Sequence, residues 1–162
     1  MPIRVASASD AEAIREVARL SWETDYPSIL GQEVVDDGIE EWYGVDSVRD
    51  ALGESGTRLL VATEDGAVVG FVHAVVDDDE GHVLRLYVDP EHRRRGVGSR
   101  LLERASEELF ERGADRVFAL VLAENERGNA FYRDHGFEKV DENETTIAGN
   151  SFREHTFVLD RD

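Results

Sequence analysis

The sequence predicts a mixed α/β domain with a central sheet, and two observations lead to this prediction. Apolar residues recur at helical spacing over the first third of the chain, and from residue 58 the pattern changes to β-rich runs joined by turn signals. After an antiparallel meander, strand and helix patterns alternate to the end, an order typical of one sheet with helices packed on it. With 162 residues, the chain is expected to form a single domain over residues 1–162.

The first predicted element is a helix that starts near residue 9. Ser9-Asp10-Ala11-Glu12 matches a capping box, and Ile14, Val17 and Ala18 follow on one helical face. The apolar residues of segment 32–53 predict one or two short helices.

Six β-rich runs are predicted to form the sheet. They cover residues 58–63, 68–76, 82–88, 117–122, 137–140 and 152–159. Asp65-Gly66 gives a hairpin signal between the first two runs. The acidic run 77–81 is expected to be a solvated loop, because it lacks further carboxylates at calcium-loop spacing. The continuous apolar run 117–122 predicts a strand buried on both faces.

Two more helices are predicted in the second half of the chain. The first covers residues 98–112, with Leu101 and Leu109 on its apolar face and Gly113 as its C-terminal stop. The second is short, covers about residues 127–135 and ends at Gly136.

The charge of the chain limits its partners. There are 36 Asp and Glu residues against 18 Lys and Arg, giving a formal net charge of −18. Such a surface repels nucleic acid and anionic lipid, so neither is expected as a partner. Of the 18 basic residues 17 are arginine and only Lys139 is lysine. This composition favours a halophilic source, in which cations screen the repulsion, over a codon preference for arginine.

The composition also excludes several classes of site. The absence of cysteine excludes disulfides, thiolate catalysis and Cys-based zinc sites. No stretch approaches the ~18 apolar residues of a membrane-spanning helix, and the first ten residues lack the apolar core of a signal peptide. We therefore expect a cytoplasmic domain without a metal site.

One short segment is basic, although the chain as a whole is strongly acidic. Four arginines, Arg93, Arg94, Arg95 and Arg100, fall within eight residues, between a predicted strand end and a predicted helix start. Unpaired amides and the helix dipole make such a position an anion site. Gly96 and Gly98 would let the backbone approach a phosphate closely.

Three other interpretations of this segment compete with an anion site. The arginines could instead pair with nearby carboxylates. A dinucleotide-binding fingerprint needs a third glycine where Leu101 stands, and a Walker A loop needs a lysine, whereas the single lysine is Lys139.

The segment resembles the signature [Gln/Arg]-x-x-Gly-x-[Gly/Ala] of the GCN5-related N-acetyltransferase (GNAT) superfamily, matched by Arg93 to Gly98. Leu86-Tyr87-Val88-Asp89-Pro90 precedes it as in that family. Asn125 and Tyr132-Arg133-Asp134-His135-Gly136-Phe137 resemble a second family stretch, N-x(6)-Y-x(3)-G-F. The resemblance covers about residues 58–140. It implies a mostly antiparallel sheet in which the strands 82–88 and 117–122 splay apart.

The resemblance also implies acetyl-CoA as cosubstrate, held between these two strands. The backbone of residues 86–88 would pair with pantetheine, the amides of residues 94–99 would bind the pyrophosphate, and Asn125 would anchor pantetheine from the other side. The expected cofactor-binding residues are Leu86, Tyr87, Val88, Arg93, Arg94, Arg95, Gly96, Val97, Gly98, Ser99 and Asn125.

For catalysis, the resemblance places Tyr132 near the sulfur as general acid, since a phenol can protonate a thiolate of comparable basicity. The general base is left open. His82 occupies the position where several relatives carry a glutamate, and Glu124, His73 or a water relay are the other options.

The expected reaction is direct transfer of an acetyl group to a primary amine in a ternary complex, with a homodimer possible. A mouth near the N-terminal helices would receive a cationic amine. Its candidate aromatic residues are Trp22, Tyr26, Trp42 and Tyr43, with the nearby acids Glu23, Asp25, Glu40 and Glu41. A catalytically idle CoA-binding or regulatory module and a nucleotide-phosphate-binding protein are the competing interpretations.

Overall fold

A seven-stranded sheet forms the centre of the molecule. The computed structural model describes residues 2–26, 31–43, 45–54, 56–93 and 95–161. Within these residues the strand order is β1-β2-β3-β4-β5-β7-β6, and every neighbouring pair is antiparallel except β4 and β5. The strands are β1 (Ile3–Val5), β2 (Thr57–Glu64), β3 (Ala67–Asp77), β4 (Glu80–Val88), β5 (Arg116–Leu122), β6 (Glu138–Ile147) and β7 (Asn150–Asp160). The predicted fold class is confirmed.

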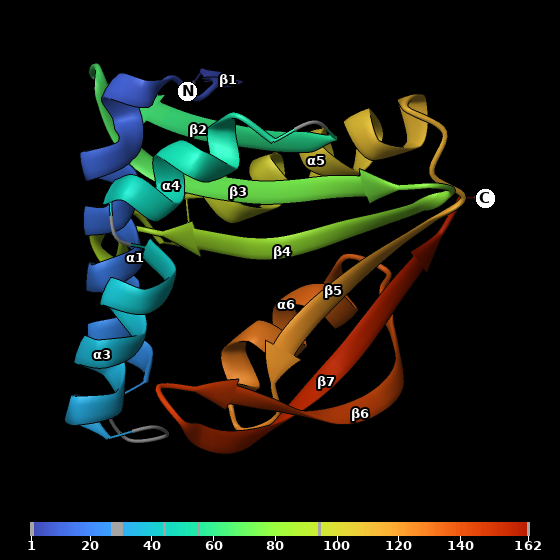
Figure 1. Cartoon of the computed structure of the whole chain (residues 1–162). Coiled ribbons are helices and arrows are strands. Elements are labelled where there is room, and N and C mark those ends of the chain that lie inside the picture. Colours follow the sequence, from blue (N-terminus) through green and yellow to red (C-terminus); the bar gives the residue numbers. More distant parts are fainter. Residues whose placement is uncertain (1, 27–30, 44, 55, 94, 162) are drawn as a thin grey trace.

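Helices cover both faces of the sheet (Figure 1). They are α1 (Ala11–Asp25), α3 (Gln32–Tyr43), α4 (Val45–Leu52), α5 (Val97–Glu111) and α6 (Glu126–Asp134), with short 3₁₀ turns η1 (Ala8–Asp10) and η2 (Pro90–His92). One apolar core, around Ile14, Trp22 and Phe71, lies between the sheet and the helices α1, α3 and α4. A second core, around Leu101 and Phe157, lies between the opposite face and α5 and α6.

The chain begins differently from the prediction. The short strand β1 pairs with β2 before any helix, and the capping interaction lies two residues earlier than expected. The Ser7 amide donates to Asp10 Oδ2 at 2.8 Å, in place of a box formed by Ser9 and Glu12. Both serines precede an acid by three residues, and the ion pair of Asp10 with Arg4, at 2.8 Å, favours the earlier position.

The two hairpins of the meander use tight turns. Asp65 and Gly66, with φ of 52° and 83°, form the predicted turn between β2 and β3. The acidic run 77–81 is not the predicted loop, because Asp77 pairs with Glu80 and only two residues form the turn. Asp78 takes φ of 55°, a conformation that short polar residues tolerate.

The parallel pairing of β4 with β5 stops after four residue pairs, of which Val83 opposite Ala119 is the last. The next residue, Leu84, is the extra residue of a β-bulge against β3, where the register shifts between His73 and Ala74. A bulge bends its strand and increases the local twist, so β4 turns away from β5 beyond this point. Figure 1 shows the two strands diverging toward α1 and α3.

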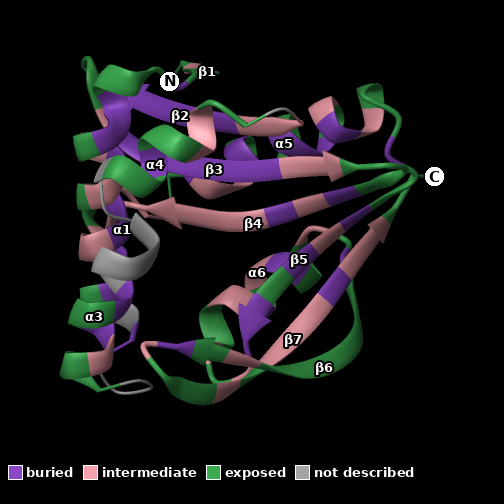
Figure 2. Cartoon of the chain, in the orientation of Figure 1, coloured by how far each residue is buried: buried purple, intermediate pink, exposed green. Residues whose placement is uncertain are grey.

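The divergence changes the burial of β5. The prediction of a strand buried on both faces is wrong, because Leu120 is 43% exposed and Phe118 is only half buried. Val117, Ala119 and Val121 on the other face are buried against α5 and its neighbours. The apolar residues of the open face therefore line a space between the two strands. In Figure 2, β5 alternates between buried and more exposed residues.

The Arg4–Asp10 pair gives a pH-dependent contribution to stability. The hydrogen bonds from Arg4, with that from the Ser7 amide, lower the pKa of the buried Asp10 carboxyl from 3.8 to about 2. Because the folded pKa is the lower one, this contribution is complete above pH ~4 and is lost as the pH falls toward 2. We expect Asp10→Asn to lower the free energy of unfolding by about 1–2 kcal/mol at pH 7, and by much less at pH 2.

The measurement is the urea unfolding midpoint of both proteins across this pH range. Asp50→Asn, at an exposed position of α4, removes the same charge and serves as the control. An equal destabilisation by Asp10→Asn at pH 7 and pH 2 would contradict the assignment.

Candidate functional site

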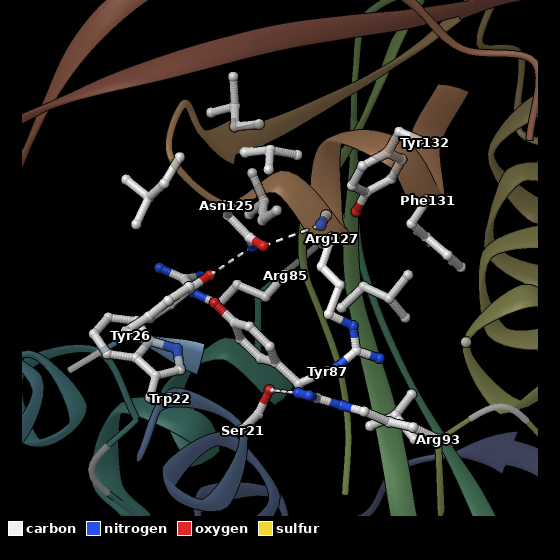
Figure 3. A pocket seen from close by; sticks show the side chains of 18 of the residues that line it. Ser21, Trp22, Tyr26, Arg85, Tyr87, Arg93, Asn125, Arg127, Phe131 and Tyr132 are labelled. Carbon is white, nitrogen blue, oxygen red and sulfur yellow. Dashed lines mark hydrogen bonds between the residues drawn. The ribbon is translucent and has the colours of Figure 1, made fainter. Parts of the chain in front are cut away.

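A pocket of about 470 Å³ occupies the opening between β4 and β5. Side chains from both faces of the sheet and from α1, α5 and α6 line it. Figure 3 shows the labelled side chains that converge on it. They are Ser21 and Trp22 from α1 and Tyr26 directly after it, Arg85 and Tyr87 from β4, Arg93 from the loop before α5, and Asn125, Arg127, Phe131 and Tyr132 near β5 and α6. The wall along β4 is the stretch Leu84–Val88, which has no partner on β5.

The loop that leads into α5 at Gly96, called the glycine loop below, lies at one end of the pocket. Gly96 has φ of 79°, a left-handed conformation that favours glycine, and it is the N-cap of α5. The amides of Val97, Gly98 and Ser99 belong to the first turn of α5, where amides have no intrahelical partner. A Cβ at Gly98 would lie 3.4 Å from the ring of Phe131, so the glycine keeps this end of the pocket open. These features fit a bound phosphate group.

Most of the predicted cofactor-binding residues lie together in the pocket. The predicted residues that line it are Leu86, Tyr87, Val88, Arg93, Gly96, Val97, Gly98, Ser99 and Asn125. Arg94 lies outside the described residues. Arg95 does not line the pocket and forms an ion pair with Glu64 at 3.4 Å. For Arg95, the pairing with a nearby carboxylate that the sequence left open is therefore observed.

Arg93 connects the loop to the N-terminal helix. Its Nη2 donates to Ser21 Oγ of α1 at 3.1 Å, an interaction drawn in Figure 3. Ser21 is almost completely buried. The guanidinium thus lines the pocket while it fixes the position of α1 beside the loop.

The hydroxyl of Ser99 is held by His135. His135 Nδ1 lies 2.7 Å from the carbonyl oxygen of Phe131, which can only accept, so Nδ1 carries a proton. The other ring nitrogen, Nε2, lies 2.9 Å from Ser99 Oγ and accepts its proton when the ring is neutral. His135 therefore orients the Ser99 hydroxyl at the start of α5.

Asn125 is the N-cap of α6. Its Oδ1 accepts from the amide of Gly128 at 3.0 Å, and its Nδ2 donates to Tyr26 Oη at 3.4 Å. A Cβ at Gly128 would lie 2.7 Å from Asn125 Nδ2, so the glycine is required by the capping geometry. Asn125 ties α6 to α1 across the pocket, in addition to lining it.

Two residues that were not predicted support the connection between β5 and α6. The side-chain amide of Asn129 donates to the carbonyl oxygens of Leu122 at 3.1 Å and Asn125 at 2.7 Å. His155 Nδ1 donates to Asn129 Oδ1 at 2.7 Å. Asn129 lies between Asn125 and Phe137, in the second stretch that resembles the family. The sequence gives no sign that its side chain forms hydrogen bonds with the backbone.

Tyr132 lies at the wall of the pocket and is 7% exposed. Its ring contacts Phe137 and Phe157 with centroid separations of 5.3 and 5.9 Å. Burial, with a smaller effect of Tyr87, raises the pKa of its phenol above the ordinary value. The phenol therefore keeps its proton at neutral pH and is available as a donor.

The structure does not bring the predicted base candidates to Tyr132. His82 lies in the paired part of β4, stacked on Phe118 with centroids 5.5 Å apart, and does not line the pocket. Glu124 is exposed and is also outside the lining. His73 is buried beside Arg85, and burial followed by the Arg85 charge lowers its pKa to about 4.

The predicted aromatic mouth is described only in part. Trp22 and Tyr26 line the pocket and contact each other edge to face, with centroids 5.2 Å apart. Glu23 is not among the lining residues and forms an ion pair with Arg19 at 2.7 Å. The side chains of Asp25, Glu40, Glu41, Trp42 and Tyr43 lie outside the described residues.

One further lining residue was missed. Glu154 of β7 is a half-buried carboxylate in the pocket wall. In the sequence it is one of 36 acidic residues, and the strand pattern around it does not distinguish it from the others.

Over the part of the chain that the structure describes, no group of three or more His, Asp or Glu side chains is arranged to hold a metal ion. Among the described helices, none is both long and apolar enough to cross a membrane.

Comparisons with known proteins agree with this geometry. Residues 12–137 match the model of the acetyltransferase (GNAT) family. A spermidine N(1)-acetyltransferase of Thermoplasma acidophilum is 30% identical over 143 residues, which cover 86% of this chain and 89% of that protein. An Escherichia coli K12 [ribosomal protein bS18]-alanine N-acetyltransferase is 34% identical over 56% of this chain and 57% of its own length.

A solved structure shows the same arrangement over most of the chain. The PaiA N-acetyltransferase of Thermoplasma acidophilum, determined in complex with coenzyme A, superimposes with a TM-score of 0.83 and 28% identity. The superposition covers 94% of this chain and 96% of that one.

The glycine loop can be tested with coenzyme A as the probe. An alanine in the left-handed conformation costs about 1–2 kcal/mol. We expect Gly96→Ala to relieve this strain by moving the loop amides, which raises the Kd for coenzyme A about tenfold in titration calorimetry. Gly113→Ala is the matched control, because Gly113 has φ of 103° at the other end of α5, outside the pocket. Equal Kd values for both variants would contradict a role of the Gly96 loop in binding.

Proposed function

This chain belongs to the GNAT acetyltransferase family, and from that premise we propose that it transfers the acetyl group of acetyl-CoA directly to a primary amine in a ternary complex. The observation that supports the proposal most is the pocket in the opening between β4 and β5. Groups from both faces of the sheet reach it, so a thioester on one side and an amine on the other can meet without a covalent enzyme intermediate.

The pocket residues fit acetyl-CoA, which would supply an activated thioester. The first-turn amides of α5 and the left-handed Gly96 suit its pyrophosphate. The backbone of Leu84–Val88, unpaired on the β5 side, offers hydrogen-bonding groups to the pantetheine amides. Asn125 lies across the pocket from this strand and lines its other wall.

Tyr132 is proposed as the general acid that protonates the departing sulfur. Its raised pKa keeps the phenol protonated before reaction. A thiolate released beside it would be desolvated in the same way, and its basicity would rise with that of the phenol. No proton-accepting role is proposed for His82, because its ring is stacked on Phe118 in the paired part of the sheet.

The acceptor is proposed to be a small primary amine. Relatives are named for spermidine and for the alanine of a ribosomal protein. Trp22, Tyr26 and Tyr87 line the side of the pocket that faces α1, and aromatic rings attract cationic groups.

The test is an acceptor panel with free thiol as the readout. The protein is incubated with acetyl-CoA and spermidine, spermine, lysine or an alanine-initiated peptide. We expect thiol release that depends on at least one amine, with the acetylated amine confirmed by mass spectrometry. Tight binding of acetyl-CoA with no amine-dependent release across the panel would favour an idle CoA-binding module.

Tyr132→Phe tests the general acid. The substitution removes only the phenolic proton donor and keeps the ring packed on Phe137 and Phe157. We expect kcat to fall about 10²-fold, within the usual contribution of acid–base catalysis, with an unchanged Kd for acetyl-CoA. A variant with the parent's kcat would remove Tyr132 from this role.

A further inference from the structure

Glu154 is a pocket carboxylate that the binding of the cofactor and the protonation of the sulfur, as proposed above, do not use. It lines the cavity from β7, opposite Leu122 of β5 in the strand register. Among the described residues that line the pocket it is the single acid, although the chain contains 36 Asp and Glu residues. The other charged or titratable side chains at the wall, besides the tyrosines, are Arg85, Arg93, Arg127 and His92.

Glu154 also lacks the partners that other buried carboxylates have. Asp10 is paired with Arg4, and Glu108 is paired with Arg58. Glu154 forms no hydrogen bond or ion pair with the described part of the chain, and burial alone raises its pKa. Withdrawing part of a carboxylate from water without giving it a partner is costly. A cation supplied by a ligand would offset that cost.

The strand register places Glu154 on the same face of the sheet as Leu122, whose side chain packs in the core with Trp22 and Tyr26. Tyr132 belongs to the opposite core, with Phe157. The carboxylate and the phenol therefore reach the opening from opposite faces of the sheet, as a reaction between two separately bound substrates requires.

The charges around the pocket also bear on the binding of an amine. Three arginines line the cavity, and they favour a polyanionic cosubstrate but repel a cationic acceptor. A positively charged amine therefore needs a local negative group. Glu154 is the lining residue that provides one, and the rings of Trp22, Tyr26 and Tyr87 line the same side.

We propose that Glu154 binds the ammonium group of the acceptor and is the catalytic base that accepts a proton from its nitrogen. The inference rests on the proposed function and assigns the acceptor class as cationic primary amines.

Each proton that moves in this reaction has a donor and an acceptor. Glu154 takes one proton from the ammonium, and the freed lone pair forms the C–N bond to the thioester carbonyl carbon. The C–S bond breaks, and Tyr132 gives its proton to the sulfur. The nitrogen loses a second proton, which restores the Tyr132 phenol, and Glu154 releases the first proton to solvent. The products are an amide, a thiol and one proton.

The experiment compares Glu154→Gln with the parent on the best amine of the acceptor panel. We expect kcat/KM for the amine to fall about 10²–10³-fold, with an unchanged Kd for coenzyme A. Titration of the amine into the coenzyme A-bound protein should show weaker binding to the variant, which is a readout independent of turnover. Glu154→Asp, which keeps the charge, should retain more activity than Glu154→Gln.

Glu144→Gln is the matched control, because Glu144 lies on the neighbouring strand β6, is exposed and does not line the pocket. We expect it to keep the parent's kcat/KM. If the parent acetylates amines and Glu154→Gln keeps the parent's kcat/KM and amine affinity, the inference is wrong. If Glu154→Gln does not fold, Glu154→Ala, which also removes the carboxylate, takes its place with the same criterion. If the parent acetylates no amine, the proposed function itself is wrong.

Discussion

The short pairing between β4 and β5 is the constraint on which the rest of the structure depends. The two strands share a ladder only as far as Val83 and Ala119, and the bulge at Leu84 then turns β4 away. Parallel strands that stayed paired would fill this space with backbone hydrogen bonds and leave no pocket. Because they separate, β4 exposes a polar backbone edge and β5 exposes Leu120, and both become walls of the site.

The electrostatics of the site differ from those of the surface. A strongly acidic chain lines the opening with arginines, and the first-turn amides of α5 lie at one end of it, where a polyanion can bind. Ion pairs such as Arg95 with Glu64 show that part of the arginine cluster instead neutralises the protein's own carboxylates. The adaptation to salt inferred from the composition stays a prediction, since the fold itself is independent of it.

The sequence predicts the order of elements well, because periodicity and turn residues act over short distances. The hairpin at Asp65-Gly66 and the helix stop at Gly113 are confirmed. The errors concern pairing between distant segments. The strand 117–122 has the composition of a fully buried strand, and only the departure of β4 exposes Leu120. For the site, a local motif identifies the loop around Gly96. Glu154 lies far from it in sequence, and only the register of β7 with β5 brings it to the pocket.

Two side-chain hydrogen bonds attach α1 to the two walls of the opening. Arg93 donates to Ser21 from the β4 side, and Asn125 donates to Tyr26 from the α6 side. Backbone pairing, which almost any sequence can form, holds β4 and β5 together up to Val83 and Ala119. Beyond that point side chains position α1 beside the opening, through these two hydrogen bonds and the apolar core around Trp22 and Phe71. Divergence among homologous chains can therefore alter the width and shape of the opening by single substitutions on α1 while the sheet stays the same. Chains that share this sheet can therefore differ in the size of the molecule that their opening admits.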